Sequence, residues 1–369
     1  MKKLMIICLL SLSLACGLPV ISGLFPSSPT KQEEKYVILR PIKVNNQWGY
    51  INETGKVIVE PQYFYANEYS EGLGAVRVEL GDRVLYGFLD ETGKMSIPPQ
   101  FGAVSEFSDG LAAVRTDNGW GYINKTGVLG IEDKYTAAMD FSDGVAGVSI
   151  NNFPNPSFFG YIDSSGNTAF EFDLEFFDKH EFPGFSEGLA PIVEEKKCFY
   201  IDKKGEIQLE VRIDQECLGA GSFLDGIASV TIKDAISGVR KGGFINNKGK
   251  VIIPTIYSQF NDFSEGLTAA GFGVEHDFKY GYIDVEGKVV IKPQFYNAFS
   301  FSEGLAAVQL VKDGDFGFID NSGKVVIEPK YGIPDGIYGG FYGGLAKVPC
   351  NDKYCYINKY GDIVWELEE

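Results

Sequence analysis

The chain of 369 residues has only two histidines and three tryptophans, and its charge is strongly one-sided. Asp and Glu number 50 against 33 Lys and Arg, which gives a formal net charge of −17 at pH 7. An acidic surface repels phosphate groups, so the composition argues against nucleic acid as a partner. Because histidine is scarce, we also expect no metal site, no cofactor and no catalytic residue.

Glycine and aromatic residues are abundant instead. The chain has 45 Gly, 28 Phe and 20 Tyr, and 44% of its residues are hydrophobic, enough to form a core. This composition favours many short strands joined by tight turns. After residue 36 no sustained apolar period of 3.6 residues is visible, so we predict an all-β fold with no helix longer than two turns.

The first residues have the pattern of an export signal. Met1–Lys3 is basic, and the apolar run Leu4–Ala15 is too short to span a bilayer. Cys16 follows Leu14-Ala15 as in a lipoprotein cleavage site, although Ser13 stands where that site usually has Leu. We therefore predict a signal peptide over 1–16 with lipidation at Cys16. Secretion without a lipid and an uncleaved anchor are the alternatives.

Residues 17–35 are rich in Pro, Ser and charged side chains, which is typical of a flexible linker. The lipid at Cys16 would be the only membrane attachment. The expected location is therefore the cell envelope, in the periplasm or at the cell surface, and otherwise the medium.

Residues 36–369 consist of repeats. An aromatic-Ile/Leu-Asn/Asp-x-x-Gly string occurs nine times at spacings of 34 to 44 residues. Its copies begin at Tyr50, Phe88, Tyr122, Tyr161, Tyr200, Phe244, Tyr282, Phe318 and Tyr356. A second string, Phe-Ser-Glu/Asp-Gly-Leu-Ala-x-Val, alternates with the first. It begins at Phe107, Phe141, Phe185, Phe263 and Phe301, and more loosely at Tyr69, Phe223 and Phe341. One array therefore occupies the whole segment.

Each recurring position has a physical reason. Asx that opens a tight turn and Gly that closes it join two strands, and Leu-Ala-x-Val supplies a third strand before them. Each unit is therefore predicted to be a three-stranded antiparallel meander. Proline in segments such as Pro61-Gln62-Tyr63 removes a ladder donor and is expected to end the third strand. The small residue after Leu and the Gly before the aromatic predict close packing, with one buried aromatic ring at each interface between units.

These residues resemble the WG (also called KWG) repeat. The resemblance rests on Trp48–Ile58 and Trp120–Gly127 and on the Ser-Glu/Asp-Gly-Leu-Ala segments, and it covers about nine-tenths of the chain. It implies a bacterial β-repeat protein, often exported, and it brings no catalytic residues. Copies five (Cys198-Phe199), six (Gly242-Gly243) and nine (Tyr354-Cys355) depart from Trp-Gly and are expected to pack differently.

Nine units lie just outside the usual four to eight blades of a closed propeller. The array also starts with a first strand and stops with a third, so no meander is divided between the chain ends. The fold class is thus all-β, an array of nine three-stranded WG repeats that forms either a propeller-like ring or an open curved superhelix.

Four cysteines lie in the repeat array of a chain predicted to be exported, where disulfides persist. Cys350 and Cys355 would face each other across a two-residue turn at Asp352-Lys353, which suits a bridge. Cys198 and Cys217 both fall in the aberrant fifth unit and are a second candidate pair. The alternative is that all four are small buried hydrophobic residues.

Two classes of function remain. Repeat arrays present variable turns on a rigid frame, so we expect a non-enzymatic binding or scaffold protein of the envelope with a protein or glycan partner. The alternative is an enzyme with a site at the axis or mouth of the array, such as a hydrolase of envelope glycans or peptides. Gly184-Phe185-Ser186-Glu187-Gly188 matches the G-x-S-x-G pattern, but it is the repeat turn, and no helix pattern follows it.

Overall fold

The computed structural model describes residues 36–152, 155–172, 183–274, 277–332, 340–350 and 353–367, all within the unit Tyr36–Glu369. The regular elements of these residues are strands, which confirms the all-β prediction. No helix among them is long and apolar enough to span a bilayer. Cys16, the linker 17–35 and both histidines lie outside the described residues.

The described strands form nine antiparallel sheets. The first sheet contains β1 (Arg40–Val44), β2 (Gln47–Ile51) and β3 (Val57–Tyr63). The second contains β4 (Tyr65–Ser70), β5 (Leu73–Leu80), β6 (Arg83–Asp90) and β7 (Met95–Phe101). The third contains β8 (Ala103–Val104), β9 (Leu111–Arg115), β10 (Trp120–Asn124) and β11 (Leu129–Tyr135). The fourth sheet contains β12 (Ala137–Ala138), β13 (Val145–Asn152), β14 (Asn155–Asp163) and β15 (Thr168–Glu171). The fifth contains β16 (Leu189–Glu194), β17 (Lys197–Asp202) and β18 (Ile207–Glu210). The sixth contains β19 (Glu216–Ala220), β20 (Ile227–Lys233), β21 (Arg240–Asn246) and β22 (Val251–Tyr257). The seventh sheet contains β23 (Leu267–Val274), β24 (Asp277–Asp284) and β25 (Val289–Phe295). The eighth contains β26 (Asn297–Ala298), β27 (Leu305–Gln309), β28 (Phe316–Asp320) and β29 (Val325–Tyr331). The ninth contains β30 (Ala346–Cys350), β31 (Lys353–Ile357) and β32 (Ile363–Glu366).

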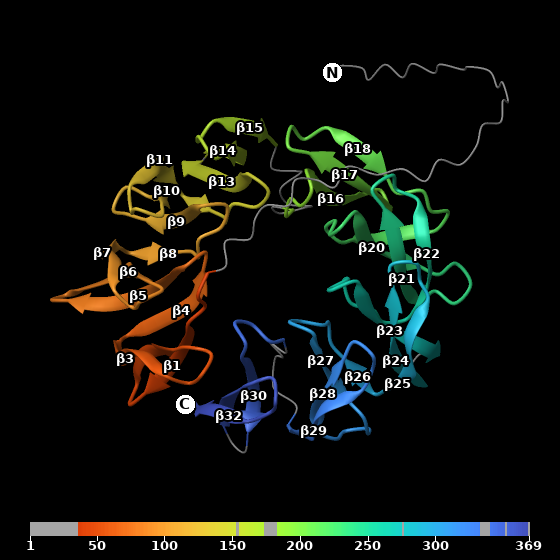
Figure 1. Cartoon of the computed structure of the whole chain (residues 1–369). Coiled ribbons are helices and arrows are strands. Elements are labelled where there is room, and N and C mark those ends of the chain that lie inside the picture. Colours follow the sequence, from red (N-terminus) through yellow and green to blue (C-terminus); the bar gives the residue numbers. More distant parts are fainter. Residues whose placement is uncertain are drawn as a thin grey trace, which may run out of the picture. The chain divides into compact units, whose positions relative to one another are not determined.

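Every sheet contains the predicted three-stranded meander in chain order. Sheets two, three, four, six and eight add a fourth strand ahead of it, namely β4, β8, β12, β19 and β26. Three of these extra strands are only two residues long, too short to produce an alternating pattern in the sequence. They pair with the meander strand nearest the centre of the ring in Figure 1.

The nine sheets stand side by side in a closed ring, the blades of a nine-bladed propeller (Figure 1). Among the described residues, nine clusters of buried side chains lie one between each pair of neighbouring sheets. The cluster between the ninth and first sheets joins Ile42 and Ile51 to Leu345, Tyr356 and Leu367. Of the two predicted architectures, the structure is therefore the ring.

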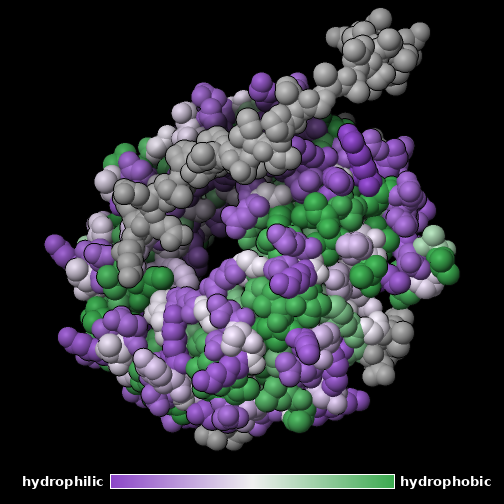
Figure 2. Space-filling model, turned by 45° about the vertical axis from the view of Figure 1, so that its right-hand side comes forward, coloured by the Kyte–Doolittle hydropathy of each residue, from purple (hydrophilic) through white to green (hydrophobic). Residues whose placement is uncertain are grey.

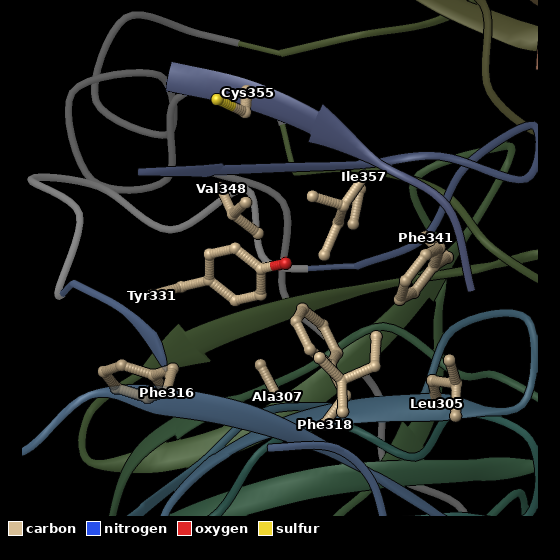
Figure 3. Close-up of a cluster of buried hydrophobic side chains, with 11 residues drawn as sticks. Leu305, Ala307, Phe316, Phe318, Tyr331, Phe341, Val348, Cys355 and Ile357 are labelled. Carbon is tan, nitrogen blue, oxygen red and sulfur yellow. The ribbon is translucent and has the colours of Figure 1, made fainter. Parts of the chain in front are cut away.

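One aromatic ring of the Tyr50 type lies at the centre of each interface, as predicted. All nine are at most 3% exposed. In eight interfaces that ring meets the aromatic of the next sheet's Ser-Glu/Asp-Gly turn, with ring centroids 4.6–5.2 Å apart. Figure 3 shows one of these cores, where Phe318 and Tyr331 of the eighth sheet face Phe341, Val348 and Ile357. Such mostly edge-to-face pairs add roughly 0.5–1.5 kcal/mol beyond the area they bury.

The prediction that proline ends the third strand is wrong. In the first sheet, Trp48 pairs with Tyr63 and Tyr50 with Val59, so the third strand holds extra residues in a β-bulge that includes Pro61. The strand then continues to Tyr63. A bulge leaves residues unpaired, so proline loses no ladder bond there.

The bulge also explains the glycine before the aromatic in six of the nine copies. A Cβ on Gly121 would lie 2.6 Å from the Ile131 carbonyl oxygen and 2.8 Å from Asp133 Cα, and five other copies show the same approach of third-strand backbone. Copies five and nine have Phe199 and Cys355 at this position, and both lack this bulge. Copy four also lacks it, although it keeps Gly160. Copy six keeps it, and the ring of Phe260 fills the space where other copies have Trp, Tyr or Phe.

The third strands form the outer edges of the ring. Figure 2 shows hydrophobic and hydrophilic side chains intermixed on the side that carries β20 to β25. Exposed apolar residues of these outer strands include Ile256, Val289 and Val290. The bulge and its proline shorten the run of free backbone groups that such an edge offers to another strand.

Candidate functional site

The antiparallel order gives the ring two unlike faces. The Ser-Glu/Asp-Gly turns and the Asx turns both lie at one end of the strands, which we call the turn face. The hairpin loops between the first and second meander strands lie at the other end, which we call the loop face. The connections from each third strand to the next sheet also lie there. The turns of the first face largely repeat the same residues from copy to copy, whereas the hairpin loops of the second face differ in length and sequence.

On the turn face, each Asx turn is closed by its own side chain. Asn52 Oδ1 accepts hydrogen bonds from the backbone N–H groups of Thr54 and Lys56, at 3.1 and 3.0 Å. Asp90 makes the same bonds to Thr92 and Lys94. The Thr92 hydroxyl donates to Asp90 and lowers the pKa of that carboxyl below its usual range, and the Ser322 hydroxyl does the same for Asp320.

A loss of stability in acid follows from these turns. A carboxyl whose pKa is lowered in the folded state stabilises it above the unfolded pKa of about 4, and this contribution is lost as the pH falls through the folded pKa. Asn cannot titrate and holds the same turn in copy one. Asp90→Asn with Asp320→Asn should therefore leave the urea midpoint at pH 7 unchanged and reduce its fall between about pH 4 and pH 2. An equally steep fall in the double variant would contradict this.

A belt of hydrogen bonds on the turn face links neighbouring sheets. In six sheets the serine hydroxyl of the Ser-Glu/Asp-Gly turn donates to the carbonyl of the next sheet's turn aromatic, at 2.5–2.7 Å. The acid beside it accepts from the next sheet's turn glycine, as Glu71 does from Gly110. Ser186, the residue of the G-x-S-x-G match, is one of these serines and bonds to Phe223. The in-phase recurrence of Ser and Glu/Asp was the signal for this belt in the sequence.

The belt has a gap at the first sheet, because no Ser-Glu/Asp-Gly turn precedes β1. Tyr342 stands in the serine position of the ninth sheet, and its hydroxyl reaches past the first sheet to the Tyr69 carbonyl of the second, at 3.0 Å. The Tyr356 hydroxyl donates to the Pro41 carbonyl at 3.1 Å. Burial raises the pKa of Tyr356 to about 12, so this phenol keeps its proton at neutral pH.

Arg40 takes the place of the missing aromatic residue in this closing interface between the ninth and first sheets. It pairs with Ile51 as Ala112 pairs with Ile123, so it occupies the slot that holds a small residue in the other sheets. The residue is 7% exposed, and its guanidinium carbon lies 5.0 Å from the ring centre of Tyr356 and 5.4 Å from that of Tyr342. Cation–π contact here replaces the ring–ring contact of the other interfaces.

The charge of Arg40 has a partner in the second sheet. Its Nη2 lies 3.5 Å from Glu68 Oε1, and its Nη1 donates to the Tyr342 carbonyl at 3.3 Å. Burial raises the pKa of Glu68, while the Arg40 charge opposes that shift. The array pattern alone did not reveal this contact, although Arg40 is the single charged residue in an otherwise small-residue slot.

The loop face differs from copy to copy. Asn45-Asn46 and Glu195-Lys196 make two-residue turns with positive φ at both positions, whereas four residues join β9 to β10 and six join β20 to β21. In the six-residue loop Asp234 Oδ1 accepts from Ser237 N at 2.7 Å, and Ile236 at the tip is 98% exposed. These loops have different shapes and side chains on one common frame.

The repeats also identify the chain by comparison with known proteins. The sequence model of the family described as "WG containing repeat" matches residues 48–79, 86–120, 120–152, 243–271, 280–311 and 316–354, more than half of the chain. The chain belongs to the WG-repeat family. Most of these matches run from the second meander strand of one sheet to the first meander strand of the next. The family repeat therefore corresponds to the two strand pairs that enclose one interface core.

Comparison with solved structures finds similar chains, one of which shares the fold of this WG-repeat protein. A crystal structure of the eukaryotic initiation factor aligns with a TM-score of 0.54 at 10% identity, over 80% of this chain and 84% of that chain. A crystal structure of Kluyvelomyces marxianus Hsv2 aligns with a TM-score of 0.36 at 12% identity, over 69% and 70%. Only the first of these TM-scores is above 0.5, and at 10% identity that comparison shows the fold alone. The comparison with curated proteins gave no match.

The WG-repeat matches leave out residues 153–242, and this gap contains the aberrant copy five. Cys198 stands there in place of the Trp and forms a disulfide with Cys217, with Cα atoms 5.7 Å apart. The two cysteines were expected within one unit, but β17 and β19 belong to the fifth and sixth sheets. The bridge is therefore a covalent link between neighbouring sheets.

Cys350 and Cys355 form a second disulfide, but the predicted register is wrong. Cys350 pairs with Lys353, and Cys355 pairs with Val348, so the two cysteines lie diagonally across the hairpin with Cα atoms 5.8 Å apart. Cys355 follows the register of the other sheets, where the residue before the buried aromatic pairs with the last apolar residue of Leu-Ala-x-Val. Core packing of Tyr356 fixes this alignment. Asp352 of the predicted turn lies outside the described residues.

The two disulfides should differ in what they stabilise. Cys198–Cys217 closes 19 residues and joins two sheets, so its loss should lower the free energy of unfolding by about 3 kcal/mol. Cys350–Cys355 closes a loop of only five residues, so its loss should lower the free energy of unfolding by less. Replacing the first pair with serine should raise amide exchange in the fifth and sixth sheets, and replacing the second should raise it only in 345–369. Alkylation of these thiols in the unreduced protein would contradict the assignment.

Within the described part of the chain, no group of three or more His, Cys, Asp or Glu side chains is arranged to hold a metal ion. Six belt carboxylates are spread around the ring, and each accepts a hydrogen bond from a backbone N–H of the next sheet's turn.

Proposed function

We propose that this protein is a non-enzymatic binding or scaffold protein of the bacterial cell envelope, which presents its loop face to a protein or glycan partner. One observation carries the proposal. The turn face repeats the same residues for structural bonds, whereas the loop face carries loops of different length, charge and hydrophobicity on the same rigid frame. Variation confined to one face of a repeat protein is typical of a binding surface.

Crosslinking in cells tests which face meets the partner. A photoreactive phenylalanine is placed at Asn118 or Ile236 on the loop face and, as matched controls, at the exposed Glu91 or Glu286 on the turn face. All four sites are exposed ends of hairpins, so their solvent access is similar. We expect crosslinked products from the loop-face positions only. Products of equal yield from both faces, or from neither, would count against the proposal.

The location is proposed on the residues of the export signal. Lipid at Cys16, which lies outside the described residues, would hold the protein stably only if more than one chain is attached. Replacing Cys16 with alanine should move the protein from the membrane pellet to the soluble fraction, with its fold unchanged by circular dichroism. A variant that stays in the pellet would show that another feature holds it there.

A further inference from the structure

Three aromatic side chains gather where the first and second sheets meet on the loop face. Trp48 lies in β2, Phe64 lies between β3 and β4, and Tyr65 begins β4; we call them the aromatic corner. Phe64 is 55% exposed and Tyr65 43%. The Trp48 and Tyr65 rings are tilted by 57° with centroids 5.5 Å apart, so Trp48 supports Tyr65 from one side.

The fold does not need these exposed rings. Phe64 N–H donates to the Arg77 carbonyl at 3.0 Å, and Gly102 and Thr136 make the same bond at 2.8 Å to the next sheets. The equivalent connections between later sheets, which we also call corners, carry Gly102-Ala103 and Thr136-Ala137 and have the same backbone hydrogen bond. A further corner carries Tyr296-Asn297, where the Lys279 ammonium covers the ring. Among the connections that the structure describes in full, two consecutive exposed aromatics therefore occur only at the first corner.

By itself the corner is too small to form a protein interface of ordinary stability. A fully covered aromatic side chain buries about 150–250 Å². With Phe64 and Tyr65 about half exposed, the corner offers roughly 200 Å² to a partner. A stable protein interface needs about 800 Å² on each side. The corner therefore fits a small ligand, of the size of one or a few sugar rings.

The charge of the corner narrows the ligand further. Lys43 and Arg77 pair with Trp48 and Tyr65 in the strand ladders, whereas the whole chain has a net charge of −17. These opposing charges select neither an acidic nor a basic ligand, which favours a neutral one. The faces of aromatic rings are partly negative and attract the partly positive C–H groups on one face of a pyranose.

We infer that the aromatic corner is a binding site for a neutral glycan, in which a pyranose ring stacks on Tyr65 and Phe64. The inference rests on the proposed binding function and names the class of its partner at this position. Stacking of this kind depends on the pyranose face more than on one sugar's hydroxyl pattern. Weak binding of several neutral oligosaccharides is therefore expected.

The test uses the purified full-length chain and titrates it with three neutral hexasaccharides, cellohexaose, chitohexaose and maltohexaose. Intrinsic tryptophan fluorescence, to which Trp48 contributes together with Trp120 and Trp365, and isothermal calorimetry report binding. The test variant is Phe64→Thr with Tyr65→Ala, which copies the Thr136-Ala137 corner of the same protein and keeps Trp48. The matched control is Tyr296→Thr with Asn297→Ala at the equivalent position. Thermal unfolding of both variants should match that of the unchanged chain.

We expect saturable binding of at least one hexasaccharide and a loss of affinity of about tenfold in the Phe64/Tyr65 variant only. No binding of any of the three, or equal affinity in both variants, would overturn the inference. Binding of a proline-rich peptide in place of the sugars would also overturn it. If loop-face crosslinks persist while sugar binding is absent, the proposed function stands and the glycan site does not.

Discussion

Replacing Arg40 with alanine is expected to lower the free energy of unfolding by about 2–3 kcal/mol and to loosen the ring at one interface only. Removing one partner of a buried ion pair leaves the other charge uncompensated, which costs about 3–5 kcal/mol when both groups are fully buried. Glu68 keeps 39% of its side chain exposed, so the expected cost is smaller. The lost contacts to Tyr342 and Tyr356 add to it.

The effect should be local and should depend on pH. Amide exchange should rise in β1–β3 and β30–β32 and stay unchanged in the fourth to sixth sheets. Burial raises the pKa of Glu68 in the folded state, so the folded protein binds this proton more tightly than the unfolded chain does. The difference in the free energy of unfolding between Arg40→Ala and the unchanged protein should therefore become smaller as the pH falls through the folded pKa of Glu68.

A double-mutant cycle with Glu68→Gln separates charge from packing. If Arg40 mainly compensates Glu68, the double variant should lose less than the sum of the two single variants. Arg115→Ala, at an exposed position in β9, is the matched control and should stay within about 0.5 kcal/mol of the unchanged protein. Additive losses, or an equal loss at Arg115, would show that Arg40 does not act through the closing interface.

Replacing Gly121 with alanine is the second change with a large expected effect. Its Cβ would lie 2.6–2.9 Å from backbone atoms of Ile131 and Asp133 in the third strand. Backbone in a paired strand cannot rotate away as a flexible side chain can, so the bulge must shift or open. We expect a loss of about 2–3 kcal/mol, with increased exchange in β10 and β11.

Gly102→Ala is the control for this change. Gly102 is exposed, and the nearest atom to an added Cβ is the Arg115 carbonyl oxygen at 3.7 Å, an ordinary contact. The control should change the free energy of unfolding by no more than about 0.5 kcal/mol. Equal losses for the two variants would mean that the glycine is required for chain flexibility and not for close approach of the third strand.

The repeat pattern predicted much of this architecture because each recurring residue has one local task. Asn52 and Gly55 close their turn without help from distant residues, and Tyr50 must be buried because no single unit can cover it. Agreement among nine copies made these tasks visible within one chain. The number of units, the meander and the aromatic cores were therefore predictable.

The errors concern features that depend on how two strands or two units fit together. Pro61 indicates a break in the ladder, but pairing with β2 decides whether that break is a bulge or a strand end. The register of Cys350 and Cys355 follows from the burial of Tyr356 against the first sheet. Ring closure depends on Arg40 and Tyr342, which lie about 300 residues apart and occur once each. A repeat pattern carries no signal for contacts that occur once.

Methyl NOE spectroscopy of the Ile- and Leu-labelled protein tests the central claim, a ring closed by contact between the first and ninth sheets. Ile42 and Ile51 share one buried cluster with Leu345 and Leu367, although the two pairs lie at opposite ends of the array. We predict NOEs between the methyl groups of these two pairs in the unchanged protein and their weakening in Arg40→Ala. Absence of these NOEs, with those inside the other interfaces intact, would show an open superhelix and contradict the account.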